Sequence, residues 1–244
     1  MPKTTSSGRC RLCGRVLGKA QMSRHLNSCL ASDSPVSANA RGVARCFHLL
    51  VEAAYAPAYG LHLEVPAQTT FGQLDRVLRD IWLECCGHMS AFRFPRKRIQ
   101  PASPGNIPQM FAALTQRDFE DEMDEGQRLM DVQVGKRLSP GVKVEYEYDF
   151  GTTTTLSIRV LGERPGSLTR SKLRLLARNE PLDIRCARCG KPATKICTEC
   201  DCSSDGALCK TCAAKHECGE GMLLPVLNTP RTGVCGYTGP SIEP

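Results

Sequence analysis

The stretch that decides the fold reads Val142-Lys-Val-Glu-Tyr-Glu-Tyr-Asp-Phe-Gly151, and after four threonines it continues as Leu156-Ser-Ile-Arg-Val160. In both halves apolar side chains alternate with polar or charged ones, which is the period of a β-strand with one buried face. Asp149 and Gly151 lie between the halves and are residue types typical of turns. We therefore expect an antiparallel hairpin in which Asp149 hydrogen-bonds the backbone of its own turn.

Three strands and one helix are expected before this hairpin. Residues 46–52 and 61–65 have the composition of strands, and residues 88–94 predict a third strand. Between them, Thr70-Phe-Gly-Gln73 is a capping box, the signature of a helix start. Apolar residues then recur at steps of three and four, as on the buried face of a helix: Leu74, Val77, Leu78, Ile81, Trp82 and Cys85.

The order strand, strand, helix, strand and hairpin predicts an α+β domain over residues 44–165. We expect a central mixed or antiparallel sheet packed on the helix, loosely β-grasp-like, with Trp82 in its core. Cys46, Cys85 and Cys86 have no second cysteine pair nearby in the sequence. We interpret these three residues as small buried hydrophobic side chains.

Residues 1–31 predict a small zinc finger that precedes this domain. Cys10-Arg-Leu-Cys13 has the spacing of a zinc knuckle, and His25 and Cys29 share one face of a short helix over residues 21–30. The motif resembles the Cys-Cys-His-Cys fingers of DNA-repair proteins that bind ubiquitin. That resemblance implies a ubiquitin-like partner, although Asn27 stands where those fingers usually place the aspartate that contacts ubiquitin.

The finger is rich in basic side chains, which have two interpretations. They could meet phosphate groups of a nucleic acid, or they could form a solvated surface. The residues concerned are Arg9, Arg11, Arg15, Lys19 and Arg24. Residues 32–43 are small, polar and contain proline, so we expect a flexible linker and a finger that moves independently.

Residues 184–244 predict a cysteine-rich module that binds two zinc ions. Four closely spaced pairs of ligands follow one another: Cys186 and Cys189, Cys197 and Cys200, Cys209 and Cys212, His216 and Cys218. The spacing allows sequential pairing or a cross-brace, in which the first and third pairs hold one ion and the second and fourth pairs hold the other. The order of the pairs resembles the MYND and B-box fingers, which usually bind proteins, and this resemblance favours the cross-brace. Cys202 is the substitute if the last pair fails, and Cys235 is a less favoured ligand.

A basic linking helix is expected over residues 166–183, where leucine, arginine and lysine predominate. Two charged stretches interrupt the central domain. The run of residues 93–98 contains an aromatic among basic residues and could contact phosphate, whereas the acidic residues 118–125 are typical of an exposed helix.

Composition limits the cellular setting and the chemistry. The chain has 244 residues, 15 cysteines and a formal charge of +7. The amino-terminal residues have no apolar core of a signal peptide, and no apolar run reaches the length of a membrane span. We therefore expect a cytoplasmic protein without a membrane partner, whose cysteines bind about three zinc ions rather than forming disulfides. Bound zinc and its thiolates would lower the net charge to about +3.

Three segments together resemble the plasmid pRiA4b ORF-3-like family. They are residues 61–74 (LHLEVPAQTTFGQL), residues 89–94 (MSAFRF) and residues 144–151 (VEYEYDFG). The resemblance covers residues 44–162 and extends to the cysteine-rich tail, and it implies an association with plasmids and mobile elements. The family commonly continues after Asp-Phe-Gly with an acidic residue and an aromatic one, whereas threonines follow here. Some relatives carry the label of resolvases, but the residue sets of serine and tyrosine recombinases are not recognisable in this chain.

These observations favour a non-enzymatic zinc-binding adaptor that binds protein or nucleic acid, because four-ligand zinc sites leave no position open for substrate. One alternative is an accessory DNA-binding protein of a mobile element. A second alternative is an enzyme of unrecognised type, which requires an open zinc site or a nucleophile with a base.

Overall fold

The computed structural model describes residues 6–33, 43–95, 128–167, 173–200 and 205–240. Its main body runs in the order β1 (Ser7–Cys10), β2 (Val16–Gly18), α1 (Lys19–Asp33), β3 (Val43–Ala53), β4 (Gly60–Pro66), α2 (Phe71–Leu78), β5 (Ser90–Arg93), β6 (Lys143–Tyr148), β7 (Thr154–Ser167) and β8 (Arg174–Asn179). A smaller unit contains β9 (Lys195–Cys197), β10 (Ala207–Leu208), α4 (Lys210–Ala213) and β11 (Leu223–Pro225).

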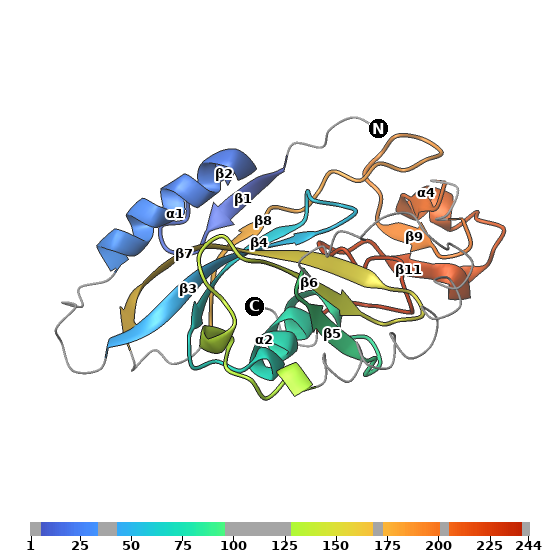
Figure 1. Cartoon of the computed structure of the whole chain (residues 1–244). Coiled ribbons are helices and arrows are strands. Elements are labelled where there is room, and N and C mark those ends of the chain that lie inside the picture. Colours follow the sequence, from blue (N-terminus) through green and yellow to red (C-terminus); the bar gives the residue numbers. More distant parts are fainter. Residues whose placement is uncertain (1–5, 34–42, 96–127, 168–172, 201–204, 241–244) are drawn as a thin grey trace, which may run out of the picture.

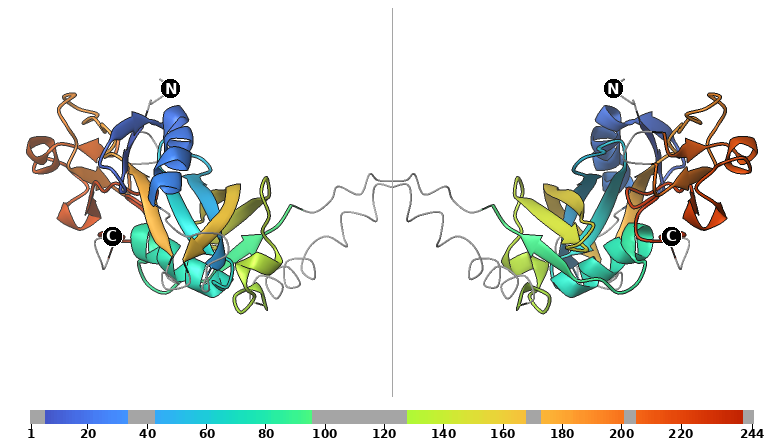
Figure 2. Two further views of the ribbon diagram at one scale, coloured as in Figure 1. Left: turned by 90° about the vertical axis from the view of Figure 1, so that its left-hand side faces the viewer. Right: turned by 90° about the vertical axis from the view of Figure 1, so that its right-hand side faces the viewer.

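Strands β1 to β8 form one eight-stranded sheet in the order β2-β1-β8-β4-β3-β7-β6-β5, and every neighbouring pair is antiparallel. Helices α1 and α2 lie on opposite faces of this sheet (Figures 1 and 2). Strands β9 to β11 form a separate three-stranded sheet at one end of the molecule. The predicted α+β class with an antiparallel sheet is therefore confirmed.

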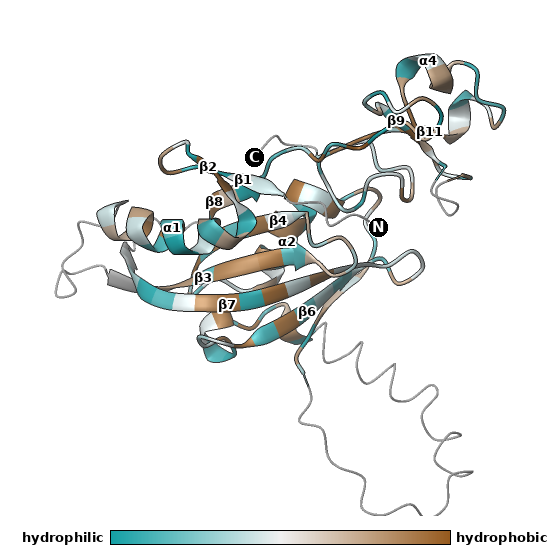
Figure 3. Ribbon diagram, turned by 90° about the horizontal axis from the view of Figure 1, so that it is seen from above, coloured by the Kyte–Doolittle hydropathy of each residue, from teal (hydrophilic) through white to brown (hydrophobic). Residues whose placement is uncertain are grey.

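The hairpin β6–β7 forms as its alternation predicts. Val144 pairs with Ile158 and Tyr146 with Leu156, and all four side chains are buried. Figure 3 shows the corresponding change between hydrophilic and hydrophobic residues along the strands. Asp149 closes the turn with a φ of 65°, and its carboxylate accepts the amide hydrogen of Gly151 at 3.0 Å.

Helix α2 starts at the predicted capping box. The Thr70 hydroxyl accepts from the Gln73 amide at 3.2 Å, and the Gln73 side chain accepts from the Thr70 amide at 2.9 Å. After Leu78 the chain continues as a π-helical turn, Arg79–Leu83, which carries the fully buried Trp82. Trp82 therefore lies in the hydrophobic core between α2 and the sheet, as expected.

The predicted basic helix over residues 166–183 is wrong for its described part, because residues 174–179 form strand β8. This strand pairs with β1 on one side and β4 on the other. It thereby satisfies the backbone groups of two strand edges that would otherwise be open. This gain outweighs the intrinsic helix preference of leucine and arginine, which tertiary contacts routinely override.

The amino-terminal finger joins the main sheet and does not stand apart from it, contrary to the expectation of independent motion. The Arg11 amide donates to Leu176 O at 2.8 Å, and the Glu180 amide donates to Ser7 O at 2.8 Å. The small core of the finger is completed by Leu176 and Ala177 of β8. Helix α1 is present as predicted, and its Met22 and Leu26 are buried.

Some sequence predictions lie outside the described residues. These are most of the linker, the basic residues 96–98, the acidic residues 118–125 and Cys202. Within the described residues, every helix is too short or too polar to cross a bilayer.

Candidate metal centres

Four clusters of cysteine and histidine are assembled among the described residues, and each could hold a metal ion. In each cluster the four ligand atoms lie within 4.8 Å of one another. Three of the clusters contain all twelve ligands predicted from the sequence. The fourth was not predicted. All 14 described cysteines are free thiols, so none of the described ligands forms a disulfide.

The finger cluster consists of Cys10, Cys13, His25 and Cys29. Cys10 ends strand β1 and is fully buried, while His25 and Cys29 come from successive turns of α1. The sulfurs of Cys13 and Cys29 each lie 3.2 Å from His25 Nε2. A hydrogen bond from the Arg15 backbone amide lowers the pKa of Cys13 to about 7, which favours the thiolate that binds metal.

The first cluster of the carboxy-terminal unit consists of Cys186, Cys189, Cys209 and Cys212. The Cys189 sulfur lies 3.5 Å from that of Cys209 and 3.7 Å from that of Cys212. A hydrogen bond from the Cys209 amide lowers the pKa of Cys186 to about 6. At neutral pH this cluster therefore already favours at least one thiolate.

The two Cys-x-x-Cys knuckles that begin these clusters share one backbone design. Gly14 follows the finger knuckle and has a φ of 75°, and Gly190 follows the other with a φ of 70°. Each glycine donates its amide hydrogen to the carbonyl of the first cysteine, at 2.8 Å and 2.9 Å. The left-handed glycine lets the chain reverse tightly enough for both sulfurs to face one ion.

The second cluster of this unit consists of Cys197, Cys200, His216 and Cys218. The Cys200 sulfur lies 3.6 Å from His216 Nε2 and 3.7 Å from the Cys218 sulfur. His216 and Cys218 lie in the loop after α4, as their spacing of two requires. The structure thus groups the first ligand pair with the third and the second with the fourth, which is the cross-brace.

The fourth cluster corrects the interpretation of Cys85 and Cys86 as buried hydrophobic residues. Cys85 is only partly buried and Cys86 is exposed, and both meet His88 and Cys235. The Cys86 sulfur lies 3.6 Å from Cys85 Sγ, 2.9 Å from His88 Nε2 and 3.8 Å from Cys235 Sγ. His88 Nε2 lies 3.1 Å from Cys235 Sγ. Cys46, by contrast, is buried as expected, with 3% of its surface exposed.

The contacts of His88 do not have the geometry of a catalytic triad. Such a triad uses one ring nitrogen of histidine for the nucleophile and the other for the carboxylate. Here the same Nε2 atom is nearest to Cys86 at 2.9 Å, to Cys235 at 3.1 Å and to the Asp149 carboxylate at 3.5 Å. One nitrogen facing two thiols is the arrangement of a metal ligand.

The ligand atoms of all four clusters lie close enough together to share one ion of the size of zinc. Zinc–sulfur bonds of about 2.3 Å place two sulfurs of a tetrahedron about 3.8 Å apart, and a sulfur and a nitrogen about 3.5 Å apart. The sulfur–sulfur separations of 3.5 to 3.8 Å are close to the first of these values. The sulfur–nitrogen separations of 2.9 to 3.6 Å are mostly shorter than the value for a bound ion. A disulfide needs sulfurs about 2.05 Å apart, which none of these pairs approaches.

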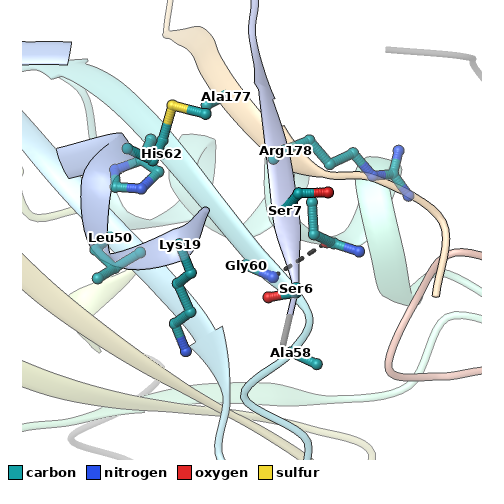
Figure 4. Close-up of a pocket in the computed structure, with 12 residues that line it drawn as sticks. Ser6, Ser7, Lys19, Leu50, Ala58, Gly60, His62, Ala177 and Arg178 are labelled. Carbon is teal, nitrogen blue, oxygen red and sulfur yellow. Dashed lines mark hydrogen bonds between the residues drawn. The ribbon is translucent and has the colours of Figure 1, made fainter. Parts of the chain in front are cut away.

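A small cavity lies between the finger and the main sheet (Figure 4). It is lined by Lys19, Leu50, His62 and Arg178 among others, and Gly60 N donates to Asn179 Oδ1 at 3.1 Å beside it. Its volume of about 30 Å³ has room for about one water molecule. Pockets that take small organic ligands are about ten times larger, so this cavity is a packing gap.

No family model matches this chain, and no curated protein matches it. Among solved structures, the chain is similar to MM3350, a protein of unknown function from Methanosarcina mazei Go1. The identity is 13%, the match covers 55% of this chain and 69% of that one, and the TM-score is 0.39. A likeness this distant carries no argument about function.

Proposed function

We propose that this chain is a non-enzymatic, zinc-binding adaptor of the pRiA4b ORF-3-like type, which binds a protein or a nucleic acid. The observation that carries the proposal is the number of protein ligands in each predicted cluster. Four protein ligands complete the coordination of zinc and leave no position for water or substrate, so such sites stabilise a fold. One zinc ion is assigned to each of the three predicted clusters.

Zinc is favoured over other metals by the donor atoms. The clusters contain thiolates with one imidazole, or thiolates alone, and lack carboxylate ligands. This donor set suits zinc in a tetrahedral site, whereas magnesium and calcium require oxygen ligands. The need for reduced thiols supports a cytoplasmic location.

A protein partner is favoured over a nucleic acid by the basic residues of the finger. Arg9 forms an ion pair with Glu180 at 2.8 Å. Lys19 pairs with Glu52 at 2.5 Å and also donates to Pro57 O at 2.6 Å. Basic side chains that are held by acidic neighbours are less available to phosphate groups.

The metal assignment is tested by the zinc content of the purified protein, measured by elemental mass spectrometry. The variant Cys189→Ser should lose one ion from the cross-brace and retain the finger ion, while Cys46→Ser, the matched control, should lose none. Because Trp82 is the single tryptophan and lies in the main body, its fluorescence should be unchanged in Cys189→Ser. A wild-type content of one ion or none would refute the proposal.

A second candidate, the accessory DNA-binding protein, is favoured by Arg15 and Arg24, which are exposed on the finger. Its test is duplex DNA binding across a series of salt concentrations. Phosphate contacts predict an affinity that falls steeply as salt rises, and Arg15→Gln with Arg24→Gln should reduce that slope. Absence of binding at low salt would exclude this candidate.

A further inference from the structure

We infer that Cys85, Cys86, His88 and Cys235 form a fourth metal centre, which takes a thiophilic divalent cation such as zinc and fastens residues 226–237 to the central domain. Three of the ligands lie on the short connection between the π-helical turn and β5. The fourth lies 149 positions after Cys86. The centre therefore joins two distant parts of the chain, unlike the other three, each of which closes a local loop or a small unit.

The backbone around Cys235 is shaped to present its sulfur. Cys235 has a φ of 48°, a left-handed conformation that costs free energy for any residue other than glycine. The flanking Gly233 and Gly236 also have positive φ, at 78° and 65°. Two successive turns hold this geometry, since the Val234 amide donates to Arg231 O at 3.1 Å and the Tyr237 amide to Val234 O at 3.0 Å.

A buried arginine donates a hydrogen bond to one of the four ligands. Arg231 is fully buried, and its Nη2 lies 3.6 Å from the Cys85 sulfur and 2.5 Å from Asp149 Oδ2. A divalent cation with three thiolates and one imidazole carries a net charge of −1, and the Asp149 carboxylate beside it adds another. The Arg231 guanidinium contacts both and offsets one of these two negative charges. Hydrogen bonds from such neighbours to the ligand sulfurs orient them and stabilise the thiolate form.

The same segment is anchored at further points of the main body. The Thr229 hydroxyl donates to Trp82 O at 2.6 Å. Arg178 of β8 donates to Asn228 O at 2.5 Å, and Asn179 donates to the Asn228 side chain at 2.6 Å. These hydrogen bonds hold the segment against the main body, where Cys235 lies close to the other three ligands. The metal would therefore add one more link between two parts of the chain that are already in contact.

The inference is tested on the intact wild-type protein by alkylation with iodoacetamide and mass mapping of each cysteine. Cys86 and Cys235 are exposed, as are Cys13 and Cys189 of the predicted zinc sites. If all four are metal ligands, all four should react slowly as purified and rapidly after a zinc chelator is added. Rapid labelling of Cys86 and Cys235, with Cys13 and Cys189 protected, would overturn the fourth centre and leave the proposed function standing.

A variant then tests the fastening role. Cys235→Ser should lower the zinc content by one ion relative to wild type and speed amide exchange in residues 226–237, with the cross-brace unchanged. Cys46→Ser serves as the matched control. Unchanged zinc content, or loss of zinc without faster exchange in that segment, would overturn the inference. If Cys235→Ser fails to fold, the labelling experiment still decides.

Discussion

Replacing Arg231 with methionine should destabilise the main body of the protein strongly. The Arg231 side chain is fully buried, and the side chain of Asp149 is only 6% exposed. The Arg231 guanidinium donates to Asp149 Oδ2 at 2.5 Å, to Thr152 O at 2.6 Å and to Thr154 Oγ1 at 3.0 Å. Methionine has a similar length but offers no donor, so the carboxylate would remain buried without its countercharge.

The magnitude follows from what remains around Asp149. Breaking a buried ion pair by removing one partner costs about 3–5 kcal/mol. The carboxylate keeps hydrogen bonds from the Gly151 amide at 3.0 Å, the Thr152 amide at 3.3 Å and the Thr152 hydroxyl at 2.5 Å. These donors stabilise part of the charge, so we expect the lower end of the range, about 3 kcal/mol.

The assay is equilibrium unfolding in urea at neutral pH, followed by the fluorescence of Trp82. This residue is the single tryptophan, and its carbonyl accepts the hydroxyl of Thr229, two residues before Arg231. Its signal therefore reports the region that the substitution affects. Zinc content, measured in parallel, separates loss of the ion pair from loss of metal at the neighbouring cysteines.

A double-mutant cycle with Asp149→Asn isolates the ion pair. Asparagine tolerates the φ of 65° at this turn, and its Oδ1 can still accept both backbone amides. The change therefore removes the charge together with the acceptor Oδ2, which Arg231 and the Thr152 hydroxyl use. If the pair is coupled, the double variant should be less damaged than the sum of the single variants by about 2–3 kcal/mol. A coupling below about 0.5 kcal/mol would refute the reasoning and assign Arg231 a role in packing alone.

Three further predictions test other parts of the fold. Burial lowers the pKa of His48 to about 4 and of His62 to about 3, so the unfolded chain gains protons first below about pH 6.5 and stability should fall from there towards pH 4. In wild type, the urea midpoint should therefore be lower at pH 5.5 than at pH 7. The double variant His48→Leu, His62→Leu should show a smaller fall in midpoint between these two pH values, and a fall as large as in wild type would contradict this prediction. Gly135→Ala should cost about 1–3 kcal/mol in the same assay, because a Cβ would lie 2.7 Å from Ala67 O, whereas Gly162→Ala, with no atom within 4 Å, should show no such clash. Cys13→Ser should lower the melting temperature of the main body, because β1 pairs with β8; a loss confined to residues 6–33 would instead support an independent finger.

The central domain could be predicted because its signals are local. The alternation in β6 and β7 and the capping box at Thr70 each depend on residues within a few positions of one another. Strand β8 could not be predicted in this way. Its conformation depends on pairing with β1 and β4, which lie more than a hundred positions earlier, and the segment itself has no alternation that favours a strand.

The metal clusters also differ in whether their signal in the sequence is local. In the finger and the cross-brace, ligands come in pairs two to four positions apart, so spacing alone indicates that they share an ion. In the fourth cluster Cys85 and Cys86 are adjacent, and side chains of adjacent residues do not face one ion in a regular helix or strand. Their convergence requires the irregular backbone after the π-helical turn and the left-handed Cys235. Tertiary contacts impose this geometry, above all those of the buried Arg231, which holds the segment in place. Spacing along the sequence therefore does not identify every cysteine that can bind a metal.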